Sequence, residues 1–99
     1  MNKEVLKTRI GKTPLIRAYK LEEKLNVGKI YLKLEGNNPT GSIEDRLAYL
    51  IVKDAISRKK DTICMTPYGV IASSIAYIAS FYDMKCKFYQ PSNQKLIRK

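Results

Sequence analysis

Short apolar segments alternate with helical patterns along most of this chain. Residues 29–35 mix apolar and polar side chains in near alternation, and residues 62–66 and 85–89 are two further short segments with strand character. Apolar residues recur at helical spacing from Ser42 and again from Val70. Strand, helix, strand, helix, strand is the order that builds a parallel sheet with right-handed crossovers. We therefore expect an α/β fold, a three-layer domain with a mostly parallel sheet.

The two helical patterns also predict which side chains are buried. Ser42, followed three residues later by Asp45, is typical of a capping box with a shortened acid, so the first helix should begin at Ser42. The apolar stripe of this helix contains Leu47, Leu50, Ile51, Ala55 and either Val52 or Ile56. The second helix should run from Val70 to Tyr82, and one of its faces is made of Ile71, Ile75, Ile78 and Tyr82.

The segment before residue 29 gives weaker signals. Residues 13–17 should be extended, because Pro14 disfavours helical geometry at the residue before it. Residues 20–26 favour a short helix that Gly28 would cap at its C-terminus. Residues 36–41 form a turn-rich loop, and residues 92–99 should begin one more helix. No linker or repeat divides the chain, so we expect a single domain over residues 1–99.

The charge balance indicates which classes of partner the chain could bind. Its formal charge is +10, from 19 Lys and Arg against 9 Asp and Glu. Such an excess attracts nucleic acid, anionic lipid or an acidic partner. A dense basic cluster, residues 58–60, lies where cations favour a helix C-terminus, so we favour this structural role over contact with nucleic acid. The seven tyrosines could stack on bases, yet most of them lie on faces that the core needs.

The residue inventory limits the chemistry and the location. The sequence has no histidine, so the usual acid–base group near neutral pH and the commonest metal ligand are absent, and we expect no metal site. Cys64 and Cys86 lack C-x-x-C spacing, which favours two buried thiols in a reducing cytosol, with a disulfide as the alternative. The start lacks the apolar core of a signal peptide, and no apolar run approaches the roughly 20 residues that span a bilayer. We therefore expect a cytoplasmic protein.

Two segments carry a specific motif. Residues 10–15 read Ile-Gly-Lys-Thr-Pro-Leu, and residues 33–46 read Lys-Leu-Glu-Gly-Asn-Asn-Pro-Thr-Gly-Ser-Ile-Glu-Asp-Arg. They resemble the I-G-x-T-P-L and K-L-E-x-x-N-P-x-G-S-x-K-D-R motifs of the cysteine synthase family, which are fold-type II pyridoxal-phosphate enzymes with a tryptophan synthase beta-like fold. The Glu-Gly-Asn-Asn-Pro spelling is similar to the cysteine synthase B branch, and threonine synthases match less closely. The strand–loop–helix from residue 62 and the next strand keep the family's spacing, so the resemblance spans about residues 10–98.

One departure from this motif concerns the chemical step. In the family, the lysine of G-S-x-K-D-R forms a Schiff base with the cofactor and moves the substrate proton, and the resemblance places that position at Glu44. A carboxylate cannot form an imine with an aldehyde. The first turn of a helix stabilises an anion by ~0.3–1 kcal/mol, so we interpret Glu44 as a helix-start carboxylate rather than a new general base.

A second departure concerns the substrate loop. The family's T-S-G-N-T-G loop binds the substrate carboxylate and the phenolic oxygen of the cofactor. Counting back from Pro91 without gaps, the resemblance places this loop on Pro67, Tyr68, Gly69, Val70, Ile71 and Ala72. Only the glycine is kept. Pro67, Val70 and Ile71 supply no side-chain group that could form these hydrogen bonds, and Pro67 also removes a backbone donor. The sequence ends before any segment like the family's glycine-rich phosphate cup, so the resemblance implies a truncated member.

These departures predict a catalytically inactive protein that binds no pyridoxal phosphate. We expect it to act through self-association as a homo-oligomer or through a partner protein, because a partial α/β domain leaves sheet edges and apolar helix surface uncovered. One alternative is a chain of a split pyridoxal-phosphate enzyme, with Glu44 in a different role. Another is a basic adaptor that binds nucleic acid or an acidic protein. Exchange into the dimer of an intact cysteine synthase is a related hypothesis.

Overall fold

The computed structural model describes residues 1–66 and 69–90. Within these ranges the α-helices and strands follow the order α1 (Lys3–Arg9), β1 (Leu15–Arg17), α2 (Tyr19–Leu25), β2 (Tyr31–Lys33), α3 (Glu44–Ser57), β3 (Thr62–Met65), α4 (Ile71–Ala79) and β4 (Lys85–Phe88). Two 3-10 helices, η1 (Glu35–Asn37) and η2 (Ser80–Tyr82), follow β2 and α4. Every element predicted inside these ranges is confirmed within a few residues, whereas α1 was not expected. The helix predicted over residues 92–99 lies outside the described residues.

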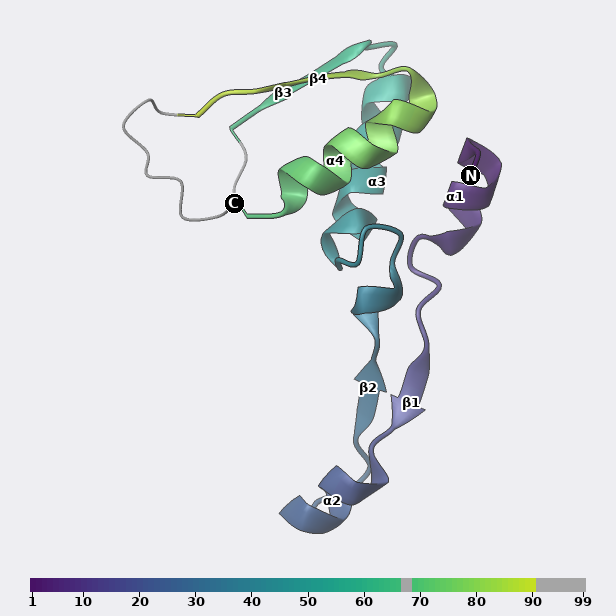
Figure 1. The fold of residues 1–99 in the computed structure, drawn as a ribbon, viewed down its shortest axis with the longest axis vertical. Coiled ribbons are helices and arrows are strands. Elements are labelled where there is room, and N and C mark those ends of the chain that lie inside the picture. Colours follow the sequence, from purple (N-terminus) through teal and green to yellow (C-terminus); the bar gives the residue numbers. More distant parts are fainter. Residues whose placement is uncertain (67–68, 91–99) are drawn as a thin grey trace.

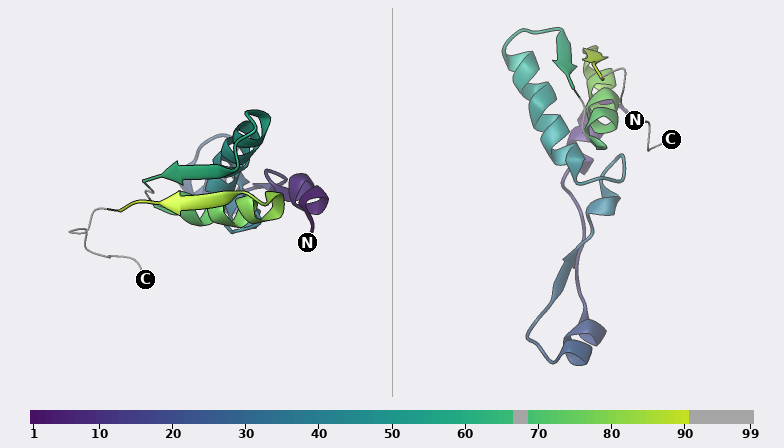
Figure 2. Two further views of the ribbon diagram at one scale, coloured as in Figure 1. Left: turned by 90° about the horizontal axis from the view of Figure 1, so that it is seen from above. Right: turned by 90° about the vertical axis from the view of Figure 1, so that its left-hand side faces the viewer.

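The described residues form two parts (Figure 1). The head contains α1, α3, α4, β3 and β4, and the arm, residues 13–34, contains β1, α2 and β2. The arm projects from the head along the longest axis, as the right-hand view of Figure 2 also shows. The radius of gyration is 17.2 Å and the extents are 50 × 38 × 22 Å, whereas a compact domain of 100 residues has a radius of gyration of about 13 Å. The arm is therefore an extension that the head does not cover.

The strands form two separate sheets rather than the single, mostly parallel sheet that the sequence predicted. β3 and β4 pair in parallel, from Thr62 opposite Lys85 to Met65 opposite Phe88. β2 instead pairs antiparallel with β1. The reason is local: the short connection through α2 returns the chain beside β1, and η1 and the following loop then lead away to α3. The described residues thus give a mixed α/β structure with one parallel and one antiparallel pair.

The core lies entirely in the head, where α4 packs against α3 and the inner side of the β3–β4 sheet. Ile75 and Ile78 of α4 and Val52 of α3 are fully buried. Leu6 of α1 completes this cluster, whose other members are Ala48, Ile63, Ile71, Ala79 and Met84.

The stripe predicted on α3 is wrong at two positions, because Leu47 and Leu50 are 51% and 64% exposed. Val52, one of the two alternatives in the predicted stripe, is fully buried, and the helix turns the smaller Ala48 towards the core in place of the two leucines, which lets α3 approach α4 closely.

Three smaller predictions also need correction. Asn26, with a φ of 52°, is the left-handed C-cap of α2 in place of Gly28. Cys64 is exposed rather than buried, because it lies on the outer face of β3. Cys86 is half-buried, and burial raises the pKa of its thiol. Both thiols are free.

Candidate functional site

Arg46, in the first turn of α3, joins the arm to the head. Its Nε and Nη2 atoms donate to the two carboxylate oxygens of Glu35 at 2.9 and 2.8 Å, and Nη2 also donates to the carbonyl oxygen of Gly11 at 3.1 Å. Glu35 further accepts hydrogen bonds from the Thr13 hydroxyl at 3.0 Å and from Nδ2 of Asn38 at 2.7 Å. A bidentate pair of guanidinium and carboxylate fixes orientation as well as distance. Arg46 therefore sets the angle at which the arm leaves the head.

Gly11 permits this close approach. Its φ is +77°, and a Cβ at this position would lie 2.8 Å from Nη1 of Arg46. The Gly11 N–H donates to Oδ1 of Asn38 at 2.8 Å, and Nζ of Lys33 donates to the carbonyl oxygen of Thr13, also at 2.8 Å. We call this set the Arg46 cluster; its members are Gly11, Thr13, Lys33, Glu35, Asn38 and Arg46.

The Arg46 cluster predicts a defined acid sensitivity. The hydrogen bonds from Arg46 lower the pKa of Glu35 from its ordinary 4.5 to about 2. Because this pKa is lower in the folded chain than in the unfolded chain, the contribution of Glu35 to stability is complete above pH 4.5 and is lost as the pH falls towards 2. We expect the urea midpoint, followed by circular dichroism, to fall over this window, and Glu35→Gln to flatten the fall. Glu23→Gln, an exposed acid on α2, is the control; an unchanged acid limb in Glu35→Gln would contradict this role.

The loop before α3 is held by a second set of hydrogen bonds. Both carboxylate oxygens of the fully buried Asp45 accept from Thr40, one from its backbone N–H and one from its hydroxyl. The Thr40 hydroxyl lies 3.4 Å from the hydroxyl of Ser74 in the first turn of α4. The predicted capping box is therefore wrong in its pairing: Asp45 bonds to Thr40, and Ser42 Oγ accepts from the N–H of Glu44 at 3.0 Å. Asp45 points towards Thr40 because the loop folds back beneath α3.

Glu44 is the first residue of α3, and its side chain is half-buried. Its carboxylate lies at the positive end of a helix of 14 residues, where a negative charge is favoured. The structure thus agrees with a helix-start position for Glu44.

The residues aligned with the substrate loop lie at the start of α4, and two of them, Pro67 and Tyr68, lie outside the described residues. Gly69 has a φ of +71°, and Val70 is the N-cap residue of α4, 45% exposed and without a side-chain capping bond. Ile71 is buried in the head core, and Ala72 is half-buried. The contact between Thr40 and Ser74 brings this turn beside the loop that precedes Glu44. The described part of the second departure therefore lies beside the loop that precedes Glu44, and the side chains of Val70, Ile71 and Ala72 in it are apolar.

The Arg46 cluster was not foreseen as a unit. Its signal was present in the sequence, because all six members lie in the two motif segments, residues 10–15 and 33–46. No group of three or more potential metal-ligating side chains occurs among the described residues. Within the same part of the chain, no helix is both long and apolar enough to cross a membrane.

A comparison with protein families shows to which family the chain belongs. A family model described as "Pyridoxal-phosphate dependent enzyme" matches residues 6–99. The chain belongs to this family. Cysteine synthase B of Escherichia coli strain K12 is 32% identical over 98 residues, which cover 95% of this chain and 32% of that relative. Threonine synthase of Mycobacterium leprae is 43% identical over 70 residues, and cysteine synthase 1 of Emericella nidulans is 35% identical over 89 residues.

This member of the pyridoxal-phosphate dependent family spans at most about a third of these relatives, since the matches cover 32%, 19% and 24% of their lengths. The residues present do not fit covalent attachment of the cofactor. The position that the motif gives to the Schiff-base lysine is a carboxylate, and the amine of Lys33 in the same motif donates to a backbone carbonyl.

Proposed function

We propose that this chain is a non-catalytic member of the pyridoxal-phosphate dependent enzyme family that acts by associating with protein, either itself or a partner. The observation that carries this proposal is a division within the motif. Its residues with a structural task, such as Glu35, Asn38 and Arg46, are kept and form hydrogen bonds across the joint. The residues to which the resemblance gives a chemical task are replaced, by Glu44 and by the apolar turn at residues 67–72.

The retained positions explain why the chain still folds as it does. The Arg46 cluster fixes the arm, and Asp45 holds the loop against α4. A chain released from catalysis keeps such contacts, because their loss destabilises the fold, whereas a lysine at a helix start is unfavourable once the reaction no longer requires it. The arm supports association, because it adds exposed apolar side chains to a small head.

Incubation with pyridoxal phosphate tests the proposal. We expect no stoichiometric adduct after borohydride reduction, and only scattered low-level labelling of surface lysines, because the carboxylate of Glu44 cannot form the internal imine. Peptide mass spectrometry reads the site and the occupancy. Cysteine synthase B of E. coli, treated in the same way, is the positive control.

A single lysine labelled to near completion would refute the proposal. The variant Glu44→Lys distinguishes the effects of the two departures from the motif. Labelling of this variant at residue 44 would mean that covalent attachment of the cofactor was lost through that side chain alone. Absence of labelling there would mean that the altered turn at residues 67–72 also contributes.

A second candidate is one chain of a split enzyme, and the comparisons favour it in one respect: about two thirds of cysteine synthase B lies outside the matched part. In such an assembly β3 and β4 would join a larger, mostly parallel sheet in a three-layer fold. A neighbouring reading frame that encodes the remaining part, with activity that requires both chains, would replace the first proposal with this one. A cytoplasmic location stays a prediction in either case.

A further inference from the structure

Helix α1 is held to the rest of the head by few contacts. Its side-chain hydrogen bonds are local: Asn2 Oδ1 accepts from the Val5 N–H at 3.0 Å, and the Thr8 hydroxyl donates to the Val5 carbonyl oxygen at 2.7 Å. Among the described residues, no hydrogen bond or ion pair joins Lys3–Arg9 to another helix or strand. Leu6 is the one buried side chain of the helix, and it is fully buried in the head core. Docking of α1 therefore depends on this leucine and on the contacts at the two ends of the helix.

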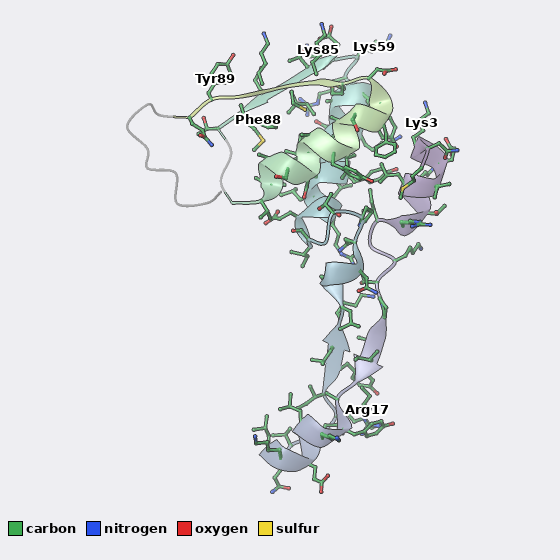
Figure 3. The ribbon with its side chains drawn as sticks, viewed as in Figure 1. Lys3, Arg17, Lys59, Lys85, Phe88 and Tyr89 are labelled. Carbon is green, nitrogen blue, oxygen red and sulfur yellow. The ribbon has the colours of Figure 1, made fainter. Side chains whose placement is uncertain are left out.

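The first turn of α1 contacts a tyrosine of η2. Nζ of Lys3 lies 5.8 Å from the centroid of the Tyr82 ring, and Nζ of Lys53, from α3, lies 5.6 Å from the same centroid. An ammonium group over an aromatic face is attracted by the negative charge of that face. Burial and a hydrogen bond with Tyr49 raise the pKa of Tyr82 to about 12, so the ring is neutral at physiological pH. Figure 3 shows Lys3 at the end of α1 that is away from the arm.

The last turn of α1 leads directly into the Arg46 cluster. The Ile10 N–H donates to the Leu6 carbonyl oxygen at 3.2 Å, and the Ile10 side chain packs against the head core. The next residue, Gly11, donates its N–H to Asn38 at 2.8 Å and accepts at its carbonyl oxygen from Arg46 at 3.1 Å. No loop separates the helix from these two bonds. Movement of α1 away from the core therefore pulls on both hydrogen bonds of Gly11.

We propose that α1 is a releasable strap whose docking tightens the joint between the head and the arm. Leu6 seats the strap, the contact of Lys3 with Tyr82 holds its first turn, and Gly11 links its last turn to Arg46. Coupling of this kind is reciprocal: whatever strengthens the docking of α1 also strengthens the bonds of Gly11, and the reverse. The inference goes beyond the proposed function, because it concerns how firmly the arm is held and not what the chain binds.

The charges around Tyr82 make this docking weak enough to be reversible. Lys3 lies in the first turn of α1, where the helix dipole disfavours a cation, and Lys53 brings a second ammonium group to the same ring. Both effects oppose the contact of Lys3 with Tyr82. An element with one buried side chain opens locally, without unfolding of the whole chain. We therefore expect α1 to open more often than α4, in which Ile75 and Ile78 are fully buried.

Amide hydrogen exchange of the full chain in increasing, subdenaturing urea tests the strap. The amides of residues 6–11 should exchange through one common opening that depends little on urea, because release of α1 exposes little surface. This exchange should be faster than that of residues 75–79 in α4. Gly11 is the decisive position, since its N–H is bonded to Asn38 and not within the helix. An opening constant shared by Gly11 and the helix would mean that release of the strap also frees the joint.

Two variants that each remove one cation from the Tyr82 ring give a matched comparison. Lys3→Gln should speed the exchange of residues 6–11 about two- to fivefold, although the change relieves the unfavourable helix dipole. Lys53→Gln removes the competing cation on α3, so it should leave the exchange of residues 6–11 unchanged or slow it. The opposite sign of the two effects distinguishes a strap from a general change in the surroundings of the ring.

Leu6→Ala tests the coupling between the helix and the joint. The opening constant of α1 should rise about thirtyfold or more, because the truncation removes the buried side chain that seats the helix. The Gly11 amide should accelerate by the same factor as the Ile10 amide.

Each of four results overturns the inference. Exchange of α1 only through global unfolding, at the rate of α4, would mean that the helix is not releasable. An unchanged Gly11 amide in Leu6→Ala, beside faster exchange in the helix, would mean that docking and joint are not coupled. Slower exchange in Lys3→Gln would leave the helix dipole as the sole effect of this lysine, and equal acceleration by Lys3→Gln and Lys53→Gln would mean that Tyr82 does not hold α1 through Lys3.

Discussion

Replacing Ile75 with alanine is expected to lower the free energy of unfolding by about 2–5 kcal/mol. Ile75 is fully buried in α4 at the centre of the head core, so the truncation removes apolar contact and leaves a cavity. A chain of this size has a total stability of only about 5–15 kcal/mol, and the arm adds nothing to the core. We therefore expect the variant to be near the limit of folding at 37 °C.

Urea unfolding followed by far-ultraviolet circular dichroism measures this effect. Ile43→Ala is the matched control, because it makes the same chemical change at a side chain that is 58% exposed. This control should lose less than about 1 kcal/mol. Equal losses in the two variants would mean that the head core is not organised around α4.

The elements of the head were predictable because each has its own local signal. The spacing of Ile71, Ile75 and Ile78 places α4 and its buried face correctly, and the short apolar runs place β3 and β4. Their parallel pairing agrees with the α/β pattern. Where several residues of one element repeat the same structural preference, the sequence alone is sufficient to locate that element and its buried face.

Helix α1 and the pairing of β2 were not predictable in this way. Only Leu6 of α1 is buried, so no apolar stripe marks the helix, although Asn2 caps it and accepts from the Val5 N–H at 3.0 Å. β2 pairs with β1 because the short connection through α2 returns the chain beside it, and the bonds of Arg46 to Glu35 and Gly11 hold the ends of this pair at the head. A strand pattern predicts that a strand exists, but it does not identify the neighbour with which the strand pairs.

The candidate site was likewise predictable only in part. The motif marked Glu44 and the turn at residues 67–72 as altered, and the structure places the described part of that turn beside the loop that precedes α3. The motif did not show that its retained residues form one cluster at the joint of arm and head. That role depends on donor and acceptor geometry between segments about 35 residues apart, such as Gly11 and Arg46.

Replacing Asp45 with alanine is expected to lower the free energy of unfolding by about 1–3 kcal/mol, because two donors of Thr40 lose a charged acceptor and a buried space opens beneath α3. Asp45→Asn keeps the shape and one acceptor oxygen, so it should lose only about half as much stability as Asp45→Ala. Asp54→Ala, an exposed acid on the same helix, is the control and should change stability by less than about 0.5 kcal/mol.

Since Thr40 also lies beside Ser74, amide exchange in the first turn of α4 should become faster in Asp45→Ala and stay unchanged in Asp54→Ala. Unchanged exchange in both variants would mean that Asp45 does not hold the loop against α4.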